Sequence, residues 1–239
     1  MAAMNITHLF TGDCQGNQYT ASFDARPFVS GARKMVYKGV LTGQGPRNNE
    51  TVIIKPFREF AGSKELCELE MAKNHEAHRI CQNYNKVSSC QSLHFILPLK
   101  AELHRPVAIA ASNNAGHVRQ LQPAEWVLIE ENIGDDFRKF VDDRGRSTTA
   151  GSSLLHAFIH YSYHVSKGAL VVSCLQGVPQ ADGKYTLDTP TIHSIQQRFG
   201  DSDKGEPGIL QVFINHKCNN LCRDYTLPKM LKNLDPSGV

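Results

Sequence analysis

The sequence lacks features of a membrane-spanning or a nucleic-acid-binding protein. No apolar run approaches the roughly 18 residues that a membrane-spanning helix needs, so we expect no membrane partner. The formal net charge is only +3, and no run of lysine or arginine is interleaved with aromatic residues, so nothing favours a nucleic-acid partner. The first residues, MAAMNITHLFTG, have neither a basic start nor a long apolar core, and we expect no signal peptide.

A regular cysteine framework is also lacking. The seven cysteines are odd in number and irregularly spaced, which favours reduced thiols and a cytoplasmic protein. Two N-glycosylation sequons begin at Asn5 and Asn49, but this short, common motif is not used in such a compartment. The chain has no repeats and no low-complexity linker. Its 239 residues, 41% of them hydrophobic, suffice for one large domain or two small lobes.

Three potential metal ligands lie within seven residues near the C-terminus, in the segment HKCNNLC (216–222). If a helix starts here, Cys218 and Cys222 share one face, and His216 reaches back from the preceding turn. The alternative is two buried thiols and a surface histidine, because the spacing is not that of a standard zinc finger. The pattern favours zinc, and a structural tetrahedral site then needs a fourth ligand from elsewhere.

The first half of the chain is rich in predicted strands. Periodicity and β-branched residues predict strands at 34–41, 51–57, 95–99 and 125–130, and one helix from an N-cap at Ser63 to about residue 83. The second half predicts a helix at 154–163, a buried strand at 168–175 and a helix or short apolar segment at 209–214. We expect an N-terminal lobe at 1–128, a C-terminal lobe at 129–232 and a frayed tail at 233–239.

Several motifs of the second half closely resemble those of the alpha-kinases, the atypical kinases that include elongation-factor, myosin heavy chain and channel-fused kinases. The matching segments are AFIHYSY (157–163), LVVSCLQGV (170–178), PTIHS (190–194), Phe199-Gly200 and HKCNNLC (216–222). Looser matches follow the same order in the first half, up to EENIGDDFRKF (130–140), which is like the family's hinge. The resemblance implies an α+β, two-lobe atypical protein-kinase fold with a structural zinc in the C-terminal lobe.

The resemblance also implies the fourth zinc ligand. The family's zinc histidine lies in the F-x-H-[FWY]-[ST]-Y motif, which places it here at His160. By itself, a histidine in such a segment is more often a satisfied core residue. The implied site is therefore His160, His216, Cys218 and Cys222, with a structural role because no ligand position is left for water.

For ATP with magnesium, the resemblance implies four binding residues. Lys55 would hold a phosphate of ATP, although a lysine on a strand often only extends to solvent. Arg33 lies in a glycine-containing turn and would be either a second phosphate partner or an ordinary surface arginine. Glu130 would lie at the adenine-binding hinge or be a solvated carboxylate. Gln176 corresponds to the magnesium-binding glutamine, and otherwise its amide needs a backbone partner. We expect the nucleotide at the junction of the lobes.

The chain departs from the family pattern at its acids. Where the family reads D-L-Q-G-V, this chain has Cys174, and a thiol cannot replace a carboxylate as a magnesium ligand. Where the family reads T-D-P, Thr189 precedes the proline, and Asp188 lies one residue earlier. The connection at 179–186 is longer than in the family and could let Asp188 move toward the metal. Asp203, where the family often has asparagine, could partly offset the lost acid.

Two function classes follow. One is an ATP-dependent protein serine/threonine kinase of the alpha-kinase type, with Asp188, Gln176, Cys174 and Asp203 as candidate catalytic residues. The other is a pseudokinase that binds nucleotide or a protein partner without efficient transfer. Lys55 and Gln176 favour nucleotide binding, and the altered acids argue against normal turnover. Cys174 as a reactive nucleophile is a further option, but a cysteine in a VVSCL strand is more often a buried small hydrophobe.

Overall fold

The computed structural model describes residues 6–24, 29–30, 34–58, 60–88, 93–109, 119–148 and 153–232. The chain divides into two compact units: unit 1 contains Met1–Met71 and Leu97–Asn132, and unit 2 contains Ala72–Ile96 and Ile133–Val239. Arg33 and the predicted tail at 233–239 lie outside the described residues.

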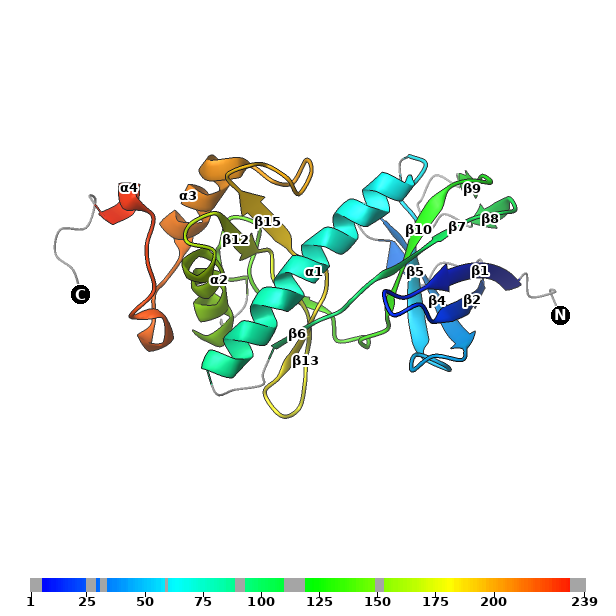
Figure 1. Ribbon diagram of the computed structural model, residues 1–239, viewed down its shortest axis with the longest axis horizontal. Helices are drawn as coiled ribbons and strands as arrows, with labels where there is room; N and C mark the ends of the chain where they lie inside the picture. The colour runs from blue at the N-terminus through cyan, green and yellow to red at the C-terminus, as the bar shows by residue number, and fades with distance from the viewer. Residues whose placement is uncertain are drawn as a thin grey trace. The chain divides into compact units, whose positions relative to one another are not determined.

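Unit 1 is built on an antiparallel sheet of seven strands (Figure 1). The strand order is β1 (Ile6–Gly12), β2 (Gln18–Asp24), β4 (Met35–Gly43), β5 (Thr51–Lys55), β10 (Trp126–Glu131) and β7 (Leu99–Glu102), with β3 (Val29–Ser30) also paired to β4. The hydroxyl of Thr11 on β1 donates to the carbonyl of Lys100 on β7 at 2.7 Å, which links the two ends of this order. A separate hairpin joins β8 (Val107–Ile109) to β9 (Arg119–Leu121).

Alternation of side chains places the core of unit 1 on one face of this sheet. Tyr19, Ala21 and Phe23 on β2 are buried, while the residues between them are more exposed, as expected for a half-buried strand. The two predicted strands at 34–41 and 51–57 are confirmed as β4 and β5. The predicted strand at 125–130 is confirmed as β10, whose Val127, Leu128, Ile129 and Glu130 are all buried.

The helix α1 (Lys64–Val87) begins in unit 1 and ends in unit 2. The hydroxyl of Ser63 accepts from the backbone N–H of Leu66 at 3.2 Å, which confirms the predicted cap. The helix continues four residues beyond the predicted end, because Tyr84 and the residues around it pack into the core of unit 2. The same packing assigns residues 72–96 to unit 2, although they precede the boundary expected at residue 128.

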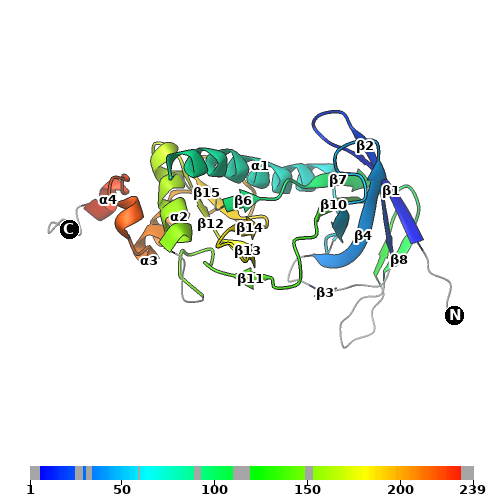
Figure 2. The same ribbon diagram turned by 90° about the horizontal axis from the view of Figure 1, so that it is seen from below.

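Unit 2 combines helices with two small sheets. Figure 2 shows the four-stranded sheet of β11 (Arg138–Lys139), β13 (Gln176–Pro179), β14 (Tyr185–Leu187) and β6 (Leu93–Phe95), in that order. A second sheet pairs β12 (Leu170–Ser173) with β15 (Thr191–Ser194). The helical elements of the unit are α2 (Ser153–Val165), α3 (Gly205–Asn215), the 3-10 helix η1 (Asn220–Cys222) and α4 (Lys229–Lys232).

One expected strand is wrong. Residues 95–99 do not form a single strand; β6 ends at Phe95 and β7 begins at Leu99, in different units. Pro98 lies in the gap, and proline lacks the N–H that a continuous ladder needs. The helices expected at 154–163 and 209–214 and the strand expected within 168–175 are confirmed as α2, α3 and β12. Among the described helices, none is long and apolar enough to span a membrane.

Candidate functional site

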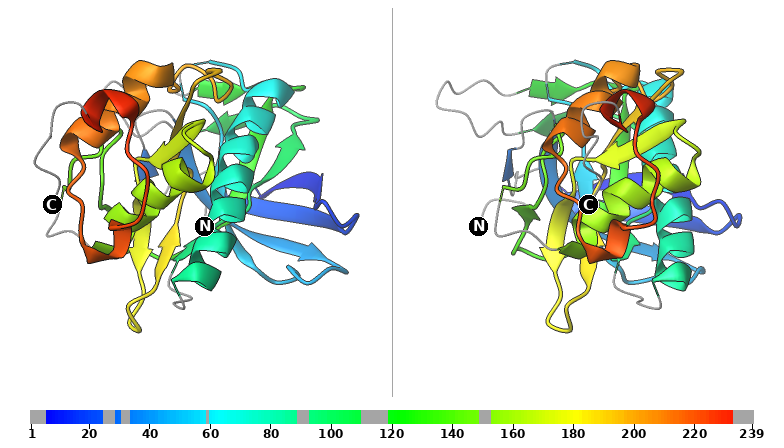
Figure 3. Two further views of the ribbon diagram at one scale, coloured as in Figure 1. Left: turned by 60° about the vertical axis from the view of Figure 1, so that its left-hand side comes forward. Right: turned by 90° about the vertical axis from the view of Figure 1, so that its left-hand side faces the viewer.

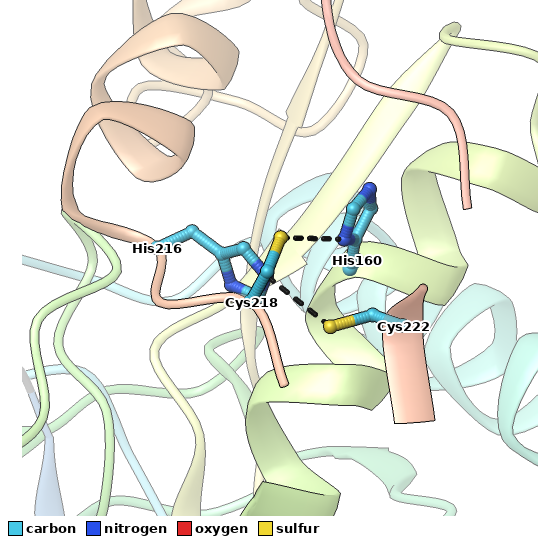
Figure 4. A group of neighbouring side chains, drawn as sticks. All are labelled: His160, His216, Cys218 and Cys222. Carbon is cyan, nitrogen blue, oxygen red and sulfur yellow. Dashed lines mark hydrogen bonds between the residues drawn. The ribbon is translucent and has the colours of Figure 1, made fainter. Parts of the chain in front are cut away.

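Four side chains of unit 2 meet at one point (Figure 4). His160 comes from the middle of α2, His216 from the end of α3, Cys218 from the segment after it, and Cys222 from η1. Their ligand atoms all lie within 4.8 Å of one another. In Figure 4 the two imidazoles and the two sulfurs point toward a common centre. The structure therefore brings together all four predicted metal ligands.

The separations within this cluster fit a tetrahedral zinc site. Zinc–sulfur bonds of about 2.3 Å and zinc–nitrogen bonds of about 2.0–2.1 Å place sulfur and nitrogen ligands about 3.6 Å apart in a tetrahedron. Sγ of Cys218 lies 3.6 Å from Nδ1 of His160, and Sγ of Cys222 lies 3.8 Å from Nε2 of His216. The donor set of two thiols and two imidazoles is one that zinc accepts.

Partners outside the cluster orient its members. Nε2 of His160 donates to the carbonyl of Thr226 at 3.1 Å, which leaves Nδ1 free to bind a metal. The backbone N–H of Asn219 donates to Sγ of Cys222 at 3.1 Å, and the side chain of Asn219 donates to the carbonyl of Ser153 at 2.8 Å. The sequence did not point to Thr226, because it lies far along the chain from His160.

Burial determines the protonation of the cluster. Desolvation lowers the pKa of His160. The pKa of His216 is lowered to about 3 by desolvation and by the charges of the neighbouring His160 and His156. Both rings are therefore neutral near pH 7 and able to donate a lone pair. Burial, together with Cys222, raises the pKa of Cys218 to about 11. A metal must therefore displace the thiol proton when it binds.

The helix that would place Cys218 and Cys222 on one face does not form. Asn219 is extended, with φ −136° and ψ 180°, and only Asn220–Cys222 forms a short 3-10 helix. The side chain of Asn219 caps this turn by accepting from the N–H of Leu221 at 2.9 Å. The two sulfurs approach each other because the chain turns back at η1, and not because they share the face of an α-helix.

Lys55 and Glu130 form an ion pair inside unit 1. They lie on neighbouring antiparallel strands, β5 and β10, and Nζ of Lys55 contacts Oε2 of Glu130. The side chain of Glu130 is only 1% exposed, and that of Lys55 is 16% exposed. The alternatives of a solvated carboxylate and a lysine extended to solvent are therefore wrong. The adenine contact of Glu130 stays a prediction.

Gln176 and Asp188 lie next to each other in unit 2. The N–H of Asp188 donates to the carbonyl of Gln176 at 2.9 Å, beside the pairing of Gly177 with Leu187. Asp188 is 6% exposed, and its Oδ1 accepts from the N–H of Thr189 at 2.7 Å. Two oxygen-bearing side chains thus lie side by side, Gln176 at the start of β13 and Asp188 directly after the end of β14.

The long connection before Asp188 is a hairpin turn. Residues 180–184 form the closed end of the β13–β14 hairpin, which Figure 3 shows in yellow, projecting from unit 2. The hairpin is closed by a hydrogen bond of 2.7 Å from the N–H of Gln180 to the carbonyl of Lys184. In this structure the backbone of Asp188 is hydrogen-bonded beside Gln176, and a movement of Asp188 toward a metal stays a prediction.

Cys174 has an unusual backbone. It lies between β12 and β13 with φ 53°, in the left-handed region that aspartate and asparagine adopt more readily than most side chains. Burial raises the pKa of its thiol, so a reactive thiolate is not favoured. The geometry suits the acid of the family pattern better than the thiol that this chain carries.

The carboxylate of Asp203 is used as a structural acceptor. Its oxygens accept four hydrogen bonds, from the N–H and the hydroxyl of Ser194 and from the N–H groups of Phe199 and Gly205, at 2.6–3.2 Å. Burial raises the pKa of Asp203, but these hydrogen bonds outweigh it, so that the pKa lies below its ordinary value. The geometry therefore favours a role in fixing the loop at 199–205, and its predicted catalytic role has no support from these contacts.

Together, the strand-rich unit 1 and the mixed unit 2 with its Cys/His cluster define an α+β fold of the atypical protein kinase class. The sequence model of the alpha-kinase family matches residues 29–222. The chain therefore belongs to the alpha-kinase family, and the predicted fold is confirmed.

Known relatives agree with this assignment. The alpha-protein kinase vwkA of Dictyostelium discoideum is 28% identical over 202 residues, which are 82% of this chain and 30% of that protein. The human transient receptor potential cation channel subfamily M member 6 is 31% identical over 113 residues, 46% of this chain and 6% of the channel. The chain thus spans less than a third of these relatives.

Solved structures show the same fold. The alpha-kinase domain of myosin heavy chain kinase A, in complex with ADP, superposes with a TM-score of 0.72 at 20% identity, covering 95% of this chain and 99% of that domain. An alpha-kinase from Entamoeba histolytica has a TM-score of 0.72 at 20% identity, covering 95% of this chain and 93% of its own.

The contacts of Asp203 generate the first prediction. Asp203→Ala should lower the free energy of unfolding by about 3 kcal/mol, because buried donors lose a charged acceptor. Since the folded pKa is lowered, this contribution is present above pH about 4 and is lost as the pH falls through the folded pKa. Thermal melts of the variant and of wild type at several pH values measure it.

Asp201→Ala is the control, because Asp201 is an exposed aspartate two residues away. A variant at Asp203 that melts like wild type but loses activity would point to a catalytic role instead.

Proposed function

We propose that His160, His216, Cys218 and Cys222 hold a structural zinc ion. The donor set, the sulfur–nitrogen separations and the bond from His160 to Thr226 support this. All four positions of a tetrahedral ion are taken by the protein, so the ion serves stability. It ties α2 to the chain that follows α3.

We further propose that the chain is an ATP-dependent protein serine/threonine kinase of the alpha-kinase type. The observation that carries this is the buried pair of Lys55 and Glu130. A carboxylate that is 1% exposed needs a compensating charge. In this arrangement Glu130 keeps the ammonium of Lys55 in place, and Lys55 binds the phosphates of ATP, as phosphoryl transfer requires.

In unit 2, Gln176 and Asp188 are the residues that would hold magnesium. Amide and carboxylate oxygens are hard ligands of the kind this ion prefers, and the backbones of these two residues are hydrogen-bonded. The ion would neutralise charge on the transferred phosphoryl group. Asp188 thereby takes the place of the carboxylate that the family pattern has one residue later.

A specific observation favours a second candidate, a pseudokinase that binds nucleotide without efficient transfer. Cys174 carries a neutral thiol where the family has an acid, and Asp203 is engaged in its own loop. Inactive forms of the myosin heavy chain kinase A domain, each with one aspartate replaced by alanine, were solved in complex with ATP. In that protein, loss of an acid and retention of ATP therefore occur together.

For the zinc, we expect elemental analysis to find one ion per chain. Cys222→Ala should lose the ion and lower thermal stability, since loss of a structural metal costs on the order of 5 kcal/mol or more. Cys14→Ala is the control, because Cys14 is a free, exposed cysteine of unit 1. A chelator titration of the wild type tests the same point without a mutation, and an unchanged melting temperature after complete metal removal would contradict the proposal.

If Lys55 binds the phosphates of ATP, Lys55→Met should weaken ATP binding by at least tenfold, about 1.4 kcal/mol. It should also destabilise the fold by about 3 kcal/mol, because the buried carboxylate of Glu130 loses the positive charge of Lys55. The double variant Lys55→Met/Glu130→Gln should regain stability but not ATP binding. Denaturant unfolding and titration with a fluorescent ATP analogue separate the two effects.

Lys38→Met, which changes an exposed lysine on the neighbouring strand β4, is the matched control. If the double variant binds ATP as tightly as wild type, Lys55 does not bind the phosphates of ATP.

The choice between kinase and pseudokinase rests on Cys174. Cys174→Asp should raise phosphoryl transfer by roughly 10²–10⁴-fold, the usual contribution of a positioned acid or base, while ATP affinity barely changes. The φ of 53° accommodates aspartate. Cys174→Asn fits the same backbone without an acid and should stay as slow as wild type. Transfer assays with labelled ATP and a basic test protein measure this.

Wild-type transfer at ordinary kinase rates, roughly 1–100 per second, would instead exclude the pseudokinase. An inert Cys174→Asp variant that binds ATP tightly would identify the altered segment at 187–190 as the cause.

A further inference from the structure

One turn of α1 holds two loops of unit 2. Lys73 and Asn74 are adjacent in the helix and are 4% and 0% exposed. Nζ of Lys73 donates to the hydroxyl of Ser202 at 3.2 Å, and Nδ2 of Asn74 donates to Oγ1 of Thr189 at 2.8 Å. Ser202 and Thr189 each directly adjoin a predicted catalytic aspartate. Neither Lys73 nor Asn74 has a part in the function proposed above.

The contact of Asn74 continues into the candidate cation site. The N–H of Thr189 donates to Oδ1 of Asp188 at 2.7 Å, and the N–H of Asp188 donates to the carbonyl of Gln176 at 2.9 Å. Thr189 is therefore held by Asn74 at its hydroxyl, while its backbone N–H contacts the carboxylate of Asp188. Because Asn74 is fully buried, it acts on the protein and not directly on a ligand.

We propose that Asn74 is a positioning residue that, through Thr189, orients the carboxylate of Asp188 for a divalent cation. The inference rests on the proposed cation-binding role of Asp188 and Gln176. Outer partners of this kind fix the orientation of ligating carboxylates, and their loss typically costs 10–100-fold in metal affinity. The pairing also accounts for a threonine at 189, since its hydroxyl accepts the amide hydrogen of Asn74.

The experiment measures Mn²⁺ affinity by electron paramagnetic resonance, on the zinc-loaded chain with a non-hydrolysable ATP analogue. Asn74→Leu and Thr189→Val each remove the same hydrogen bond with little change of shape. Each should weaken Mn²⁺ binding by about 10–100-fold. The double variant should bind Mn²⁺ no more weakly than either single variant, because the two residues act as one unit.

Stability gives the readout that separates positioning from a purely structural role. Asn74→Leu leaves the hydroxyl of Thr189 without its donor, whereas the double variant removes both polar groups, so its melting temperature should recover while its Mn²⁺ affinity stays low. Asn85→Leu is the matched control. Asn85 lies on the same helix and donates to the carbonyl of Leu93 at 2.7 Å, so its loss should lower stability without changing Mn²⁺ affinity.

Asp188→Asn separates a failure of the positioning role of Asn74 from a failure of the cation site itself. If it weakens Mn²⁺ binding while Asn74→Leu does not, the positioning role of Asn74 is overturned and the cation site stands. If wild type shows no saturable Mn²⁺ binding, or Asp188→Asn leaves it unchanged, the cation site itself is wrong and the role of Asn74 falls with it.

Discussion

The helix α2 is buried along eight consecutive residues, from Leu155 to Ser162, and its polar side chains must therefore find partners inside unit 2. Ser162 donates its hydroxyl to the carbonyl of Ile159 and accepts from the N–H of Val172, which fastens the helix to β12. His160 donates to Thr226 on one side and faces Cys218 on the other. The contacts of His160 fasten the segment that follows α3 to α2, in addition to the packing of Tyr225, Leu227 and Leu231 against the core of unit 2.

In unit 1 the buried group that needs a partner is a charged carboxylate, and not a neutral polar side chain. Glu130 lies in a strand whose neighbours Leu128 and Ile129 are completely buried, so its carboxylate needs the ammonium of Lys55. Such a pair contributes little net stability compared with apolar residues of the same size. The pair is therefore consistent with the proposed phosphate-binding role of an oriented Lys55.

The departures from the family pattern have unequal structural consequences. At 188–190 the chain has local hydrogen bonds, in which Thr189 is held by Asn74 and Asp188 by Thr189. At Cys174, in contrast, the backbone keeps a left-handed conformation that suits an acid, while the thiol provides none of its chemistry. At the first change the side chains therefore have hydrogen-bond partners. The second leaves a thiol on a backbone conformation that suits an aspartate, and the choice between the two proposed functions rests on this residue.

Short-range patterns and motif spacing determined much of this protein from the sequence. Apolar periodicity located α2, β4, β5 and β12, because burial of one face or of a whole segment is encoded residue by residue. The resemblance identified the family and the four residues that the structure brings together as candidate metal ligands, including His160, whose own surroundings in the sequence suggested only a core histidine. Prediction failed where the local pattern was ambiguous. The apolar segment at 95–99 looked like one strand, and only Pro98 and the packing of two units divide it.

Only the tertiary structure decided which partners the polar side chains have. The bonds from Asn74 to Thr189, from His160 to Thr226 and from Asp203 to Ser194 join residues on different elements. No periodicity in the sequence encodes such pairs, since they depend on how elements pack after each has formed. The sequence by itself thus determined which residues can do chemistry. Packing decided which of them stay available for it, because a buried polar group must be satisfied by whatever the fold places beside it.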